Sequence, residues 1–553
     1  MTQPANTAAR RLVETLVMNG IDRVFCVPGE SYLAVLDALA DVRDRIEVIA
    51  CRHEAGAANM AEAYGKLTGK PGVCMVTRGP GATHASIGVH TAHQDSTPMI
   101  LFVGQIALTD RGRGAFQEVD YREVFGGLAK WATELESPER TVEVVERAFA
   151  TALQGRMGPV VVGLPEDILH ADGGPAPVRP VQPAKAALAP AFVEQVRERL
   201  AQAERPLLVL GGSGWTDEAS MAIGDWAEQL GLPVALSFRR KDLVSNDRSN
   251  YGGDLGLGCN PKLTARVKAA DLILAVGARL GENPTQGYTL LDRARTAETL
   301  IHIHPGPEEL GRVWTPLLSA AADNSLAALA LSEIDPGRTW AAEAAAARAD
   351  YDGFIQPVQV TGPVNMSEVI RHLAEALPDD AIVTNGAGNF AAWLHRFHRH
   401  RARRTQLAPT SGAMGYGYPA ALAAKSVHPE RDVICIAGDG DYMMTGQEIA
   451  TAVQYGINAV VVVVDNGTYG TIRMHQETHY PGGARTIATD LRNPDFVAYA
   501  EAFGAFGVRC ERTEDFPAAL AAARNAGRPA LVHLITSAED IAPGRTISGL
   551  RSK

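Results

Sequence analysis

Short runs of β-branched residues alternate with amphipathic helical patterns along nearly the whole chain. A parallel strand that is covered by helices on both faces is hydrophobic throughout, because neither face meets water. Such runs, each followed by a helical pattern, indicate βαβ units. We therefore predict an α/β fold of doubly wound parallel sheets, with ligands at the carboxyl ends of the strands. The predicted strands cover residues 22–28, 46–50, 72–77, 99–104, 159–165, 206–212, 232–237, 271–277, 299–305, 381–386, 432–440, 459–467 and 529–535.

Two segments interrupt this alternation. Residues 171–190 are rich in Pro and Ala and lack apolar periodicity, which favours an extended linker. A second seam runs from residue 334 to 363 through an Ala-rich stretch with a helical pattern. At 553 residues the chain is also too long for one hydrophobic core. We predict three domains, at residues 1–175, 190–340 and 360–553.

Charge and hydropathy exclude several classes of partner. The net charge of −11 argues against nucleic acid, since nucleic-acid-binding proteins usually present a basic face. The first 20 residues are amphipathic and lack the basic and apolar regions of a signal peptide. The longest apolar run, residues 459–464, is too short to cross a bilayer. The six cysteines show no CxxC spacing and mostly lie in apolar runs, as reduced core thiols do. We expect a cytoplasmic protein that binds neither membranes nor nucleic acid.

Two polar turns follow predicted strands of the third block. Gly438 and Gly440 flank Asp439, where they allow a sharp turn and a close approach to a ligand. Asn466 ends the next predicted strand, and the carbonyl of Thr468 follows it. Mg²⁺ prefers a near-octahedral set of oxygens, often shared between protein groups and phosphates. Each turn alone would serve equally as an ordinary connection, but together they predict a Mg²⁺ site.

Residues 431–472, with a GDGD opening and an Asn-Gly-x-Tyr-Gly loop, resemble the signature of thiamine-diphosphate (ThDP) enzymes of the decarboxylase and acetohydroxyacid synthase superfamily. Residues 51–98 resemble the same superfamily, where Glu54 matches the carboxylate that hydrogen-bonds the cofactor's pyrimidine ring. This hydrogen bond supports proton removal from the thiazolium by the cofactor's own imine. An isolated Glu54 would equally suit the first turn of a helix. The resemblance implies ThDP and Mg²⁺ as cofactors.

Other segments of the third block also resemble this superfamily. Residues 411–425 resemble the part that bends the cofactor, which implies Met414 as the supporting side chain. Simple core packing is as typical for an isolated methionine. Residues 384–393 resemble the loop at the diphosphate end. The resemblance therefore implies further cofactor contacts from Gly388, Asn389 and Tyr469.

Residues 114–130 resemble acetohydroxyacid synthases, whose Phe-Gln pair and later Lys line the substrate pocket. The resemblance implies Phe116, Gln117 and Lys130 as substrate residues, with Gln117 also catalytic. Pyruvate decarboxylases carry paired histidines here for proton delivery, and the absence of such a pair favours carboligation. Anabolic synthases usually place a Trp where this chain has His475, which leaves the acceptor open. A small pocket with a cation for a carboxylate makes pyruvate the first candidate donor.

Several alternatives stay open at this level. FAD, which the synthases bind in the middle domain, is weakly supported, because His304 stands where an acidic residue is usual and isolated glycines indicate little. The rival activities are a 2-keto-acid decarboxylase, a benzaldehyde-lyase-type enzyme, an acetyltransferase and a flavin oxidase. A nucleotide-binding regulatory protein is the alternative outside catalysis, and the presence of Glu54, Asp439 and Asn466 argues against it.

Two further expectations concern histidines and assembly. Histidines on helices are more often surface or interior residues than metal ligands, so no metal site is predicted for His53, His84, His90 and His93. The resemblance implies a homodimer or homotetramer, in which Glu54 of one subunit serves the cofactor held by Asp439 of another.

Overall fold

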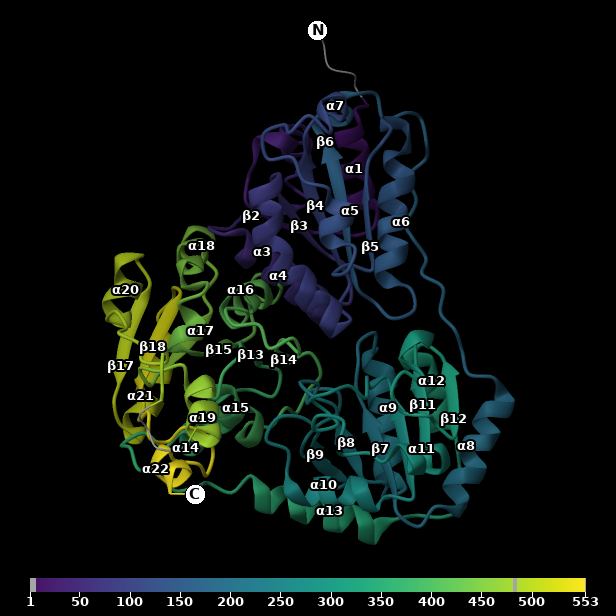
Figure 1. Cartoon of the computed structure of the whole chain (residues 1–553), viewed down its shortest axis with the longest axis vertical. Helices are drawn as coiled ribbons and strands as arrows, with labels where there is room; N and C mark the ends of the chain where they lie inside the picture. Colours follow the sequence, from purple (N-terminus) through teal and green to yellow (C-terminus); the bar gives the residue numbers. More distant parts are fainter. Residues whose placement is uncertain (1–5, 481–484, 553) are drawn as a thin grey trace.

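Each predicted block of the chain contains one six-stranded parallel sheet. The computed structural model describes residues 6–480 and 485–552. Helices cover both faces of each sheet, and the three domains surround a common centre (Figure 1). These features confirm the predicted α/β fold of three parallel-sheet domains.

The N-terminal and C-terminal sheets share one topology. Their strand orders are β2-β1-β3-β4-β6-β5 and β14-β13-β15-β16-β18-β17, whereas the middle sheet has the order β12-β11-β10-β7-β8-β9. In each sheet the order reverses beside its first strand, and a ligand crevice forms where the connections leave in opposite directions. The strands of the first two sheets are β1 (Arg23–Cys26), β2 (Glu47–Ala50), β3 (Gly72–Val76), β4 (Met99–Gln105), β5 (Trp131–Glu134), β6 (Pro159–Pro165), β7 (Pro206–Leu210), β8 (Val234–Leu236), β9 (Tyr251–Asp254), β10 (Leu272–Val276), β11 (Leu300–His304) and β12 (Leu318–Ala321). Those of the third are β13 (Ile382–Asn385), β14 (Gln406–Leu407), β15 (Val433–Gly438), β16 (Val460–Asp465), β17 (Phe506–Cys510) and β18 (Ala530–Ile535).

Most strands are linked by helices that run back across a sheet. The N-terminal domain contains α1 (Ala8–Met18), α2 (Leu33–Ala40), α3 (Glu54–Thr68), α4 (Gly79–Asp95), α5 (Tyr121–Phe125), α6 (Thr141–Leu153) and α7 (Glu166–His170). The middle region contains α8 (Pro190–Gln202), α9 (Asp217–Gln229), α10 (Pro261–Ala269), α11 (Arg293–Thr299), α12 (Asn324–Ser332) and α13 (Ala341–Phe354). The C-terminal domain contains α14 (Met366–Ala376), α15 (Phe390–Phe397), α16 (Gly417–Val427), α17 (Asp439–Tyr442), α18 (Ile449–Tyr455), α19 (Gly470–His479), α20 (Phe496–Ala502), α21 (Phe516–Arg524) and α22 (Ile547–Arg551).

Two details differ from the sequence prediction. The strands that it missed are β5, β9, β12, β14 and β17, and each of them is the outermost strand of its sheet. Helix α13 packs against β9 and α10. The packing of the middle domain therefore continues to residue 354, beyond its predicted end at residue 340.

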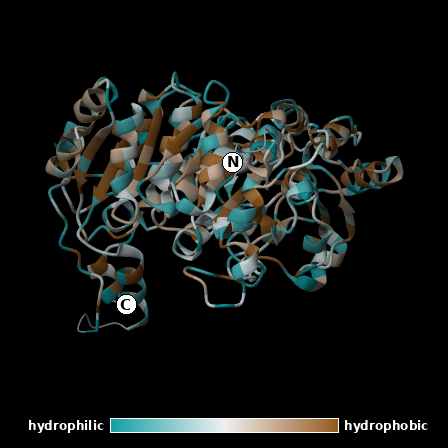
Figure 2. Cartoon of the chain, turned by 90° about the horizontal axis from the view of Figure 1, so that it is seen from above, coloured by the Kyte–Doolittle hydropathy of each residue, from teal (hydrophilic) through white to brown (hydrophobic). Residues whose placement is uncertain are grey.

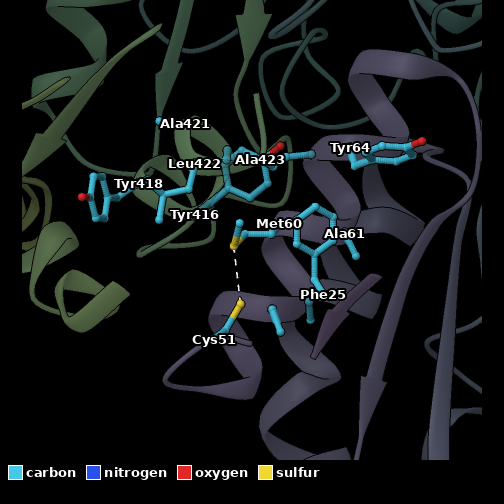
Figure 3. Packing of buried hydrophobic residues seen from close by; sticks show 14 of the residues in the cluster. Phe25, Cys51, Met60, Ala61, Tyr64, Tyr416, Tyr418, Ala421, Leu422 and Ala423 are labelled. Carbon is cyan, nitrogen blue, oxygen red and sulfur yellow. Dashed lines mark hydrogen bonds between the residues drawn. The ribbon is translucent and has the colours of Figure 1, made fainter. Parts of the chain in front are cut away.

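The N-terminal and C-terminal domains share one hydrophobic core. Side chains of a strand alternate between the two faces of its sheet. Accordingly Phe25 packs toward the C-terminal domain, whereas Cys26 packs in the core on the opposite face. Helix α3 contributes Met60 and lies against α16, which contributes Leu422, and all of these side chains are buried (Figure 3). The two domains therefore form one packed unit.

A buried ionic cluster lies within this shared interface. The ammonium of Lys66 is 2.5 Å from Asp95 Oδ2 and 3.2 Å from Glu62 Oε1, and these three side chains are at most 3% exposed. The hydroxyl of Tyr416, from the C-terminal domain, donates to Glu62 Oε2 at 2.6 Å. Lys66 also donates to the carbonyl of Ala408 at 3.1 Å. One lysine therefore pairs with two buried carboxylates and ties them to the C-terminal domain.

Replacing Lys66 by Met should destabilise the protein by about 3–5 kcal/mol, because two buried carboxylates would lose the cation that pairs with both of them. Urea denaturation, monitored by circular dichroism, should show this loss of stability as a lower urea midpoint of the first unfolding transition. Lys70→Met is the matched control, since the Lys70 ammonium bonds a carbonyl in an exposed position. Equal midpoints for Lys66→Met and the wild-type protein would contradict the role given to the cluster.

Hydrophobic residues are concentrated on the strands and on the helix faces that cover them (Figure 2). The outer surfaces of the helices are mostly hydrophilic. In the part of the chain that the structure describes, no helix has both the length and the apolar character needed to cross a membrane.

Candidate cofactor site

A cavity of about 410 Å³ opens at the carboxyl edge of the C-terminal sheet. It lies where β13, β15 and β16 end, beside the reversal of strand order. This volume is in the range of small-molecule sites. The structure brings to it all the residues of the C-terminal domain that the sequence analysis assigned to the cofactor, namely Gly388, Asn389, Met414, Gly438, Asp439, Gly440, Asn466, Thr468 and Tyr469.

Asp439 is the first residue of α17 and is 3% exposed. Its Oδ2 accepts hydrogen bonds from the backbone N–H of Gly467 at 3.0 Å and from Asn493 Nδ2 at 2.7 Å. Burial raises the pKa of Asp439 to about 6, against the lowering effect of the Asn493 hydrogen bond. Because burial disfavours the charged carboxylate, a cation beside it would stabilise the charge.

The donor set suits Mg²⁺ held with a diphosphate. The Asp439 carboxylate, the Asn466 amide and the Thr468 carbonyl offer oxygens, the atoms that Mg²⁺ prefers. Glycines hold the backbone close to the cavity. A Cβ at Gly438 would lie 2.7 Å from the Phe390 ring, and one at Gly440 would lie 2.4 Å from the Tyr469 ring. A larger residue at either position would displace these rings. With their oxygen donors and closely placed backbone, the residues of this cavity fit Mg²⁺ and a diphosphate.

A second layer of polar groups, which the sequence analysis missed, orients Asp439. Asn493 Nδ2 also donates to Asp465 Oδ1 at 2.8 Å, and Asp465 Oδ2 lies 2.9 Å from His533 Nε2. Asp465 directly precedes Asn466, so its position next to the motif could have predicted that it belongs to the site. Asn493 and His533 lie outside any recognisable motif, and only the fold brings them to Asp439.

Asp441 is another acidic residue of the cavity without a role in the sequence analysis. Its Oδ1 accepts the backbone N–H groups of Gly415 at 2.8 Å and Ala387 at 3.1 Å. Its Oδ2 is buried and has no hydrogen-bond partner within the described residues. Burial raises the pKa of Asp441 to about 7, although both backbone hydrogen bonds lower it. Asp441 thus fixes the loops before α15 and α16 against α17.

Glu54 lies in the N-terminal domain and is the first residue of α3. Its Oε2 is 2.8 Å from His84 Nδ1 on α4. The backbone N–H groups of Arg52 and His53, just before it, donate to Glu448 of the C-terminal domain at 3.0–3.2 Å. Glu54 is not among the residues that line the 410 Å³ cavity. Within one chain Glu54 and the 410 Å³ cavity are therefore separate.

Gln117 and Phe116 lie beside the turn between β3 and α4. The backbone N–H of Gly79 donates to the Gln117 carbonyl at 3.2 Å, and Gln117 has a left-handed backbone with φ of 64°. A Cβ on Gly81, in the first turn of α4, would lie 3.4 Å from Glu54 Oε1. The turn therefore joins Gln117 to Glu54. Phe116 is 77% exposed and does not line the cavity of its own chain.

The structure does not bring Lys130 and His475 to these groups. Lys130 directly precedes β5, so it lies at the amino edge of the N-terminal sheet, whereas Glu54 and Gln117 lie at the carboxyl edge. The expected pocket of Phe116, Gln117 and Lys130 is therefore not formed within one chain. His475 is exposed on α19, where its ring stacks on His479 at 6.0 Å. The α19 residues that line the cavity, Gly470, Thr471 and Ile472, belong to the preceding turn of the helix.

A separate polar cavity of about 330 Å³ lies beside the carboxyl ends of β7 and β10. A dinucleotide such as FAD would lie at this position in a sheet of the middle domain's strand order. Arg240 and Arg279 line it, but they already donate to the carbonyls of Asp95 at 3.2 Å and Gln94 at 2.9 Å. A flavin diphosphate would have to compete with these carbonyls, so the geometry gives FAD no added support.

Comparison with known proteins agrees with this geometry. Residues 6–124, 193–331 and 386–534 match, respectively, the N-terminal TPP binding domain, the central domain and the C-terminal TPP binding domain of thiamine pyrophosphate enzymes. The chain therefore belongs to the thiamine pyrophosphate enzyme family.

Within that family the chain is similar to acetolactate synthases. It is 32% identical to the acetolactate synthase large subunit of Parasynechococcus marenigrum (strain WH8102), over 95% of this chain and 87% of the relative. It is 31% identical to the acetolactate synthase isozyme 2 large subunit of Escherichia coli (strain K12), over 97% and 96%. The probable acetolactate synthase large subunit of Methanocaldococcus jannaschii is 30% identical, over 97% and 93%. The chain is an acetolactate-synthase-like, ThDP-dependent enzyme.

Proposed function

We propose that this protein decarboxylates a short 2-keto acid, with pyruvate as the favoured donor, and joins the remaining fragment to a second carbonyl compound. The observation that carries the proposal is the cavity in which Asp439, Asn466 and Thr468 present oxygens beside Met414. When bound, ThDP supplies the carbon nucleophile and the electron sink for this chemistry. Mg²⁺ is the proposed metal, and the cytoplasm is the proposed location.

Each of the chain's own site residues would have a role that follows from its position. Asp439, Asn466 and the Thr468 carbonyl would hold the diphosphate through Mg²⁺, and Met414 would support the bent cofactor. Glu54 would hold the pyrimidine ring and its proton. Gln117 would orient the substrate near Glu54. Burial of the cavity would exclude water and strengthen each of these electrostatic contacts.

We further propose that the active site is shared between subunits of a homodimer or homotetramer. Glu54 and Gln117 do not line the cavity that holds Asp439 in the same chain. A side chain as apolar as Phe116 is 77% exposed beside Gln117 in the single chain. A second copy of the chain would cover Phe116 and supply the missing cavity.

The experiment that tests the proposed reaction supplies ThDP and Mg²⁺ and offers 2-keto acids singly and in pairs, with products identified by mass spectrometry. Acetolactate from pyruvate alone would support the proposal. Aldehyde as the sole product would identify a simple decarboxylase. Consumption only of larger or aromatic donors would favour a benzaldehyde-lyase type, and acetyl phosphate formed in phosphate buffer would identify an acetyltransferase.

We propose Arg78, instead of Lys130, as the cation that binds the substrate carboxylate. Its guanidinium donates to the Phe116 carbonyl at 3.4 Å and lies 3.7 Å from Glu166, and its side chain is 15% exposed. Its Nε is buried without a partner among the described residues. Arg78 is therefore a cation with unused donor capacity beside Gln117.

Replacing Arg78 by Gln should raise the KM for pyruvate by about 10- to 100-fold, the worth of a hydrogen bond to a charged group. The fall in kcat should be smaller, because the carboxylate leaves as CO₂ before ligation. Steady-state kinetics measure both constants. Arg113→Gln is the matched control, since its side chain is 73% exposed near the same segment. An unchanged KM in Arg78→Gln would remove Arg78 from the substrate site.

A further inference from the structure

Two histidines flank the proposed activating carboxylate, and neither has a role in the function described above. His84 comes from α4 and His53 directly precedes α3. One ligand atom from each of His53, Glu54 and His84 lies within 4.8 Å of the others. The proposed role of Glu54 needs only one carboxylate oxygen for the pyrimidine ring. The second carboxylate oxygen of Glu54 is therefore available to another partner.

The two oxygens of Glu54 have different surroundings. Oε2 is 2.8 Å from His84 Nδ1, a distance typical of a charge-assisted hydrogen bond. Oε1 makes no hydrogen bond to the described residues and faces the turn at Gly81. A carboxylate has about four acceptor positions, so a donor at Oε2 leaves Oε1 free for a ring nitrogen. His84 must carry its proton on Nδ1 to be that donor.

His53 holds the His84 ring in place. The Nδ1 of His53 accepts the backbone N–H of Ala55 at 3.0 Å, which caps α3 and fixes the ring. The two imidazole rings lie 4.5 Å apart, centre to centre, at 31°. Burial and the neighbouring His84 lower the pKa of His53, which keeps this ring neutral against the other. A neutral ring that is fixed by the helix cap gives the His84 ring a firm neighbour to pack against.

We propose that His84 is a positioning residue, which donates a hydrogen bond from Nδ1 to Glu54 Oε2 and so presents Oε1 to the cofactor's pyrimidine ring, with His53 as its support. This inference rests on the proposed function, because it acts through Glu54. His84 itself contacts neither the substrate nor the thiazolium ring. A loose Glu54 would lose the fixed geometry on which a proton-transfer group depends.

The first test uses the cofactor-free protein, labelled with ¹⁵N-histidine and kept in EDTA so that no cation occupies the three side chains. One ring-nitrogen resonance should vanish in His84→Asn and shift in Glu54→Gln. The same resonance should be unaffected in the control His90→Asn, which removes another imidazole from α4. A His84 resonance that is insensitive to Glu54→Gln would overturn the hydrogen bond and with it the proposal.

The second test measures exchange of the thiazolium C2 proton in the holoenzyme. His84→Ala should slow this exchange about tenfold, as the loss of one hydrogen bond to a charged group would. His84→Asn should stay within about threefold of the wild-type rate, because an amide N–H in the same place can donate the same bond. His53→Asn keeps the helix cap but removes the stacked ring, and it should slow exchange by about twofold.

A double variant separates positioning from a general structural effect. In the Glu54→Gln background, adding His84→Ala should change the exchange rate less than twofold, since residues that act through one another are not additive. Fully additive losses, or a wild-type rate in His84→Ala, would overturn the proposal while leaving the proposed function intact. If the wild-type protein itself fails to accelerate C2 exchange over free ThDP, the proposed function fails instead, and this inference fails with it.

Discussion

Replacing Asp439 by Ala is expected to abolish Mg²⁺-dependent binding of ThDP while the C-terminal domain keeps its fold. A methyl group cannot replace a metal-ligating carboxylate. Loss of an outer-shell partner typically weakens a metal site by about 10- to 100-fold, so loss of the ligand itself should exceed that. Isothermal titration calorimetry with ThDP at saturating Mg²⁺ measures the affinity, and circular dichroism checks the fold.

Two further variants make this result specific. Asn493→Ala should weaken binding by about 10- to 100-fold, because Asn493 orients Asp439 from the second layer. Asp490→Ala is the matched control, since its carboxylate is 88% exposed and pairs with Arg473. Unchanged ThDP affinity in Asp439→Ala would remove Asp439 from the metal site, whatever the other variants do.

Replacing Glu54 by Gln should leave ThDP bound but reduce turnover by about 10²- to 10⁴-fold, the usual worth of a positioned proton-transfer group. The amide keeps the shape of the carboxylate and loses its ability to take a proton. Calorimetry measures the binding, and steady-state kinetics measure the turnover. Glu47→Gln is the control, because the Glu47 carboxylate is 49% exposed and pairs with Arg23. Wild-type turnover in Glu54→Gln would leave Glu54 as a helix-start residue.

The same variants test whether sites are shared between subunits. Chains that carry Glu54→Gln and chains that carry Asp439→Ala are each inactive alone. In a mixed dimer, one site would receive both intact residues, so random reassembly should restore roughly one quarter of the wild-type activity. Mass spectrometry confirms that the subunits have exchanged. No activity in confirmed mixed dimers would show that each chain builds its own site.

The interior strands of each sheet could be predicted from the sequence, as could the edge strand β2, but the other edge strands could not. A central strand such as β16 is buried on both sides and forms an unbroken run of valines. An edge strand has one neighbour, so it can be very short or partly exposed to water. The pattern of β12 alternates between half-buried and exposed residues, and β14 has only two residues. Hydrophobic runs are the signal for strands, so strands that lack such runs escape it.

The candidate site could be predicted where its chemistry is local. Asp439 and Asn466 follow adjacent strands, and parallel strands carry their carboxyl ends to one edge. Lys130 lies away from Gln117 in the chain for the same physical reason, because it precedes a strand and so lies at the opposite edge of the sheet. Asn493 reaches Asp439 across 54 positions of sequence from a loop without regular structure. No spacing rule predicts such a contact.

The contact between Glu448 and the backbone just before Glu54 bears on how a dimer would bind ThDP. It follows α17, which begins with Asp439, and its carboxylate accepts the N–H groups just ahead of Glu54. In a dimer with shared sites, Asp439 and Glu54 of one chain belong to different catalytic centres. The short segment from Asp439 to Glu448 therefore connects the two centres. If filling the first centre moves this connection, the affinity of the second centre changes, and by linkage each occupancy then changes the other's affinity by the same factor. The contact of Glu448 thus gives the two centres a direct route through which ThDP binding at one can be felt at the other.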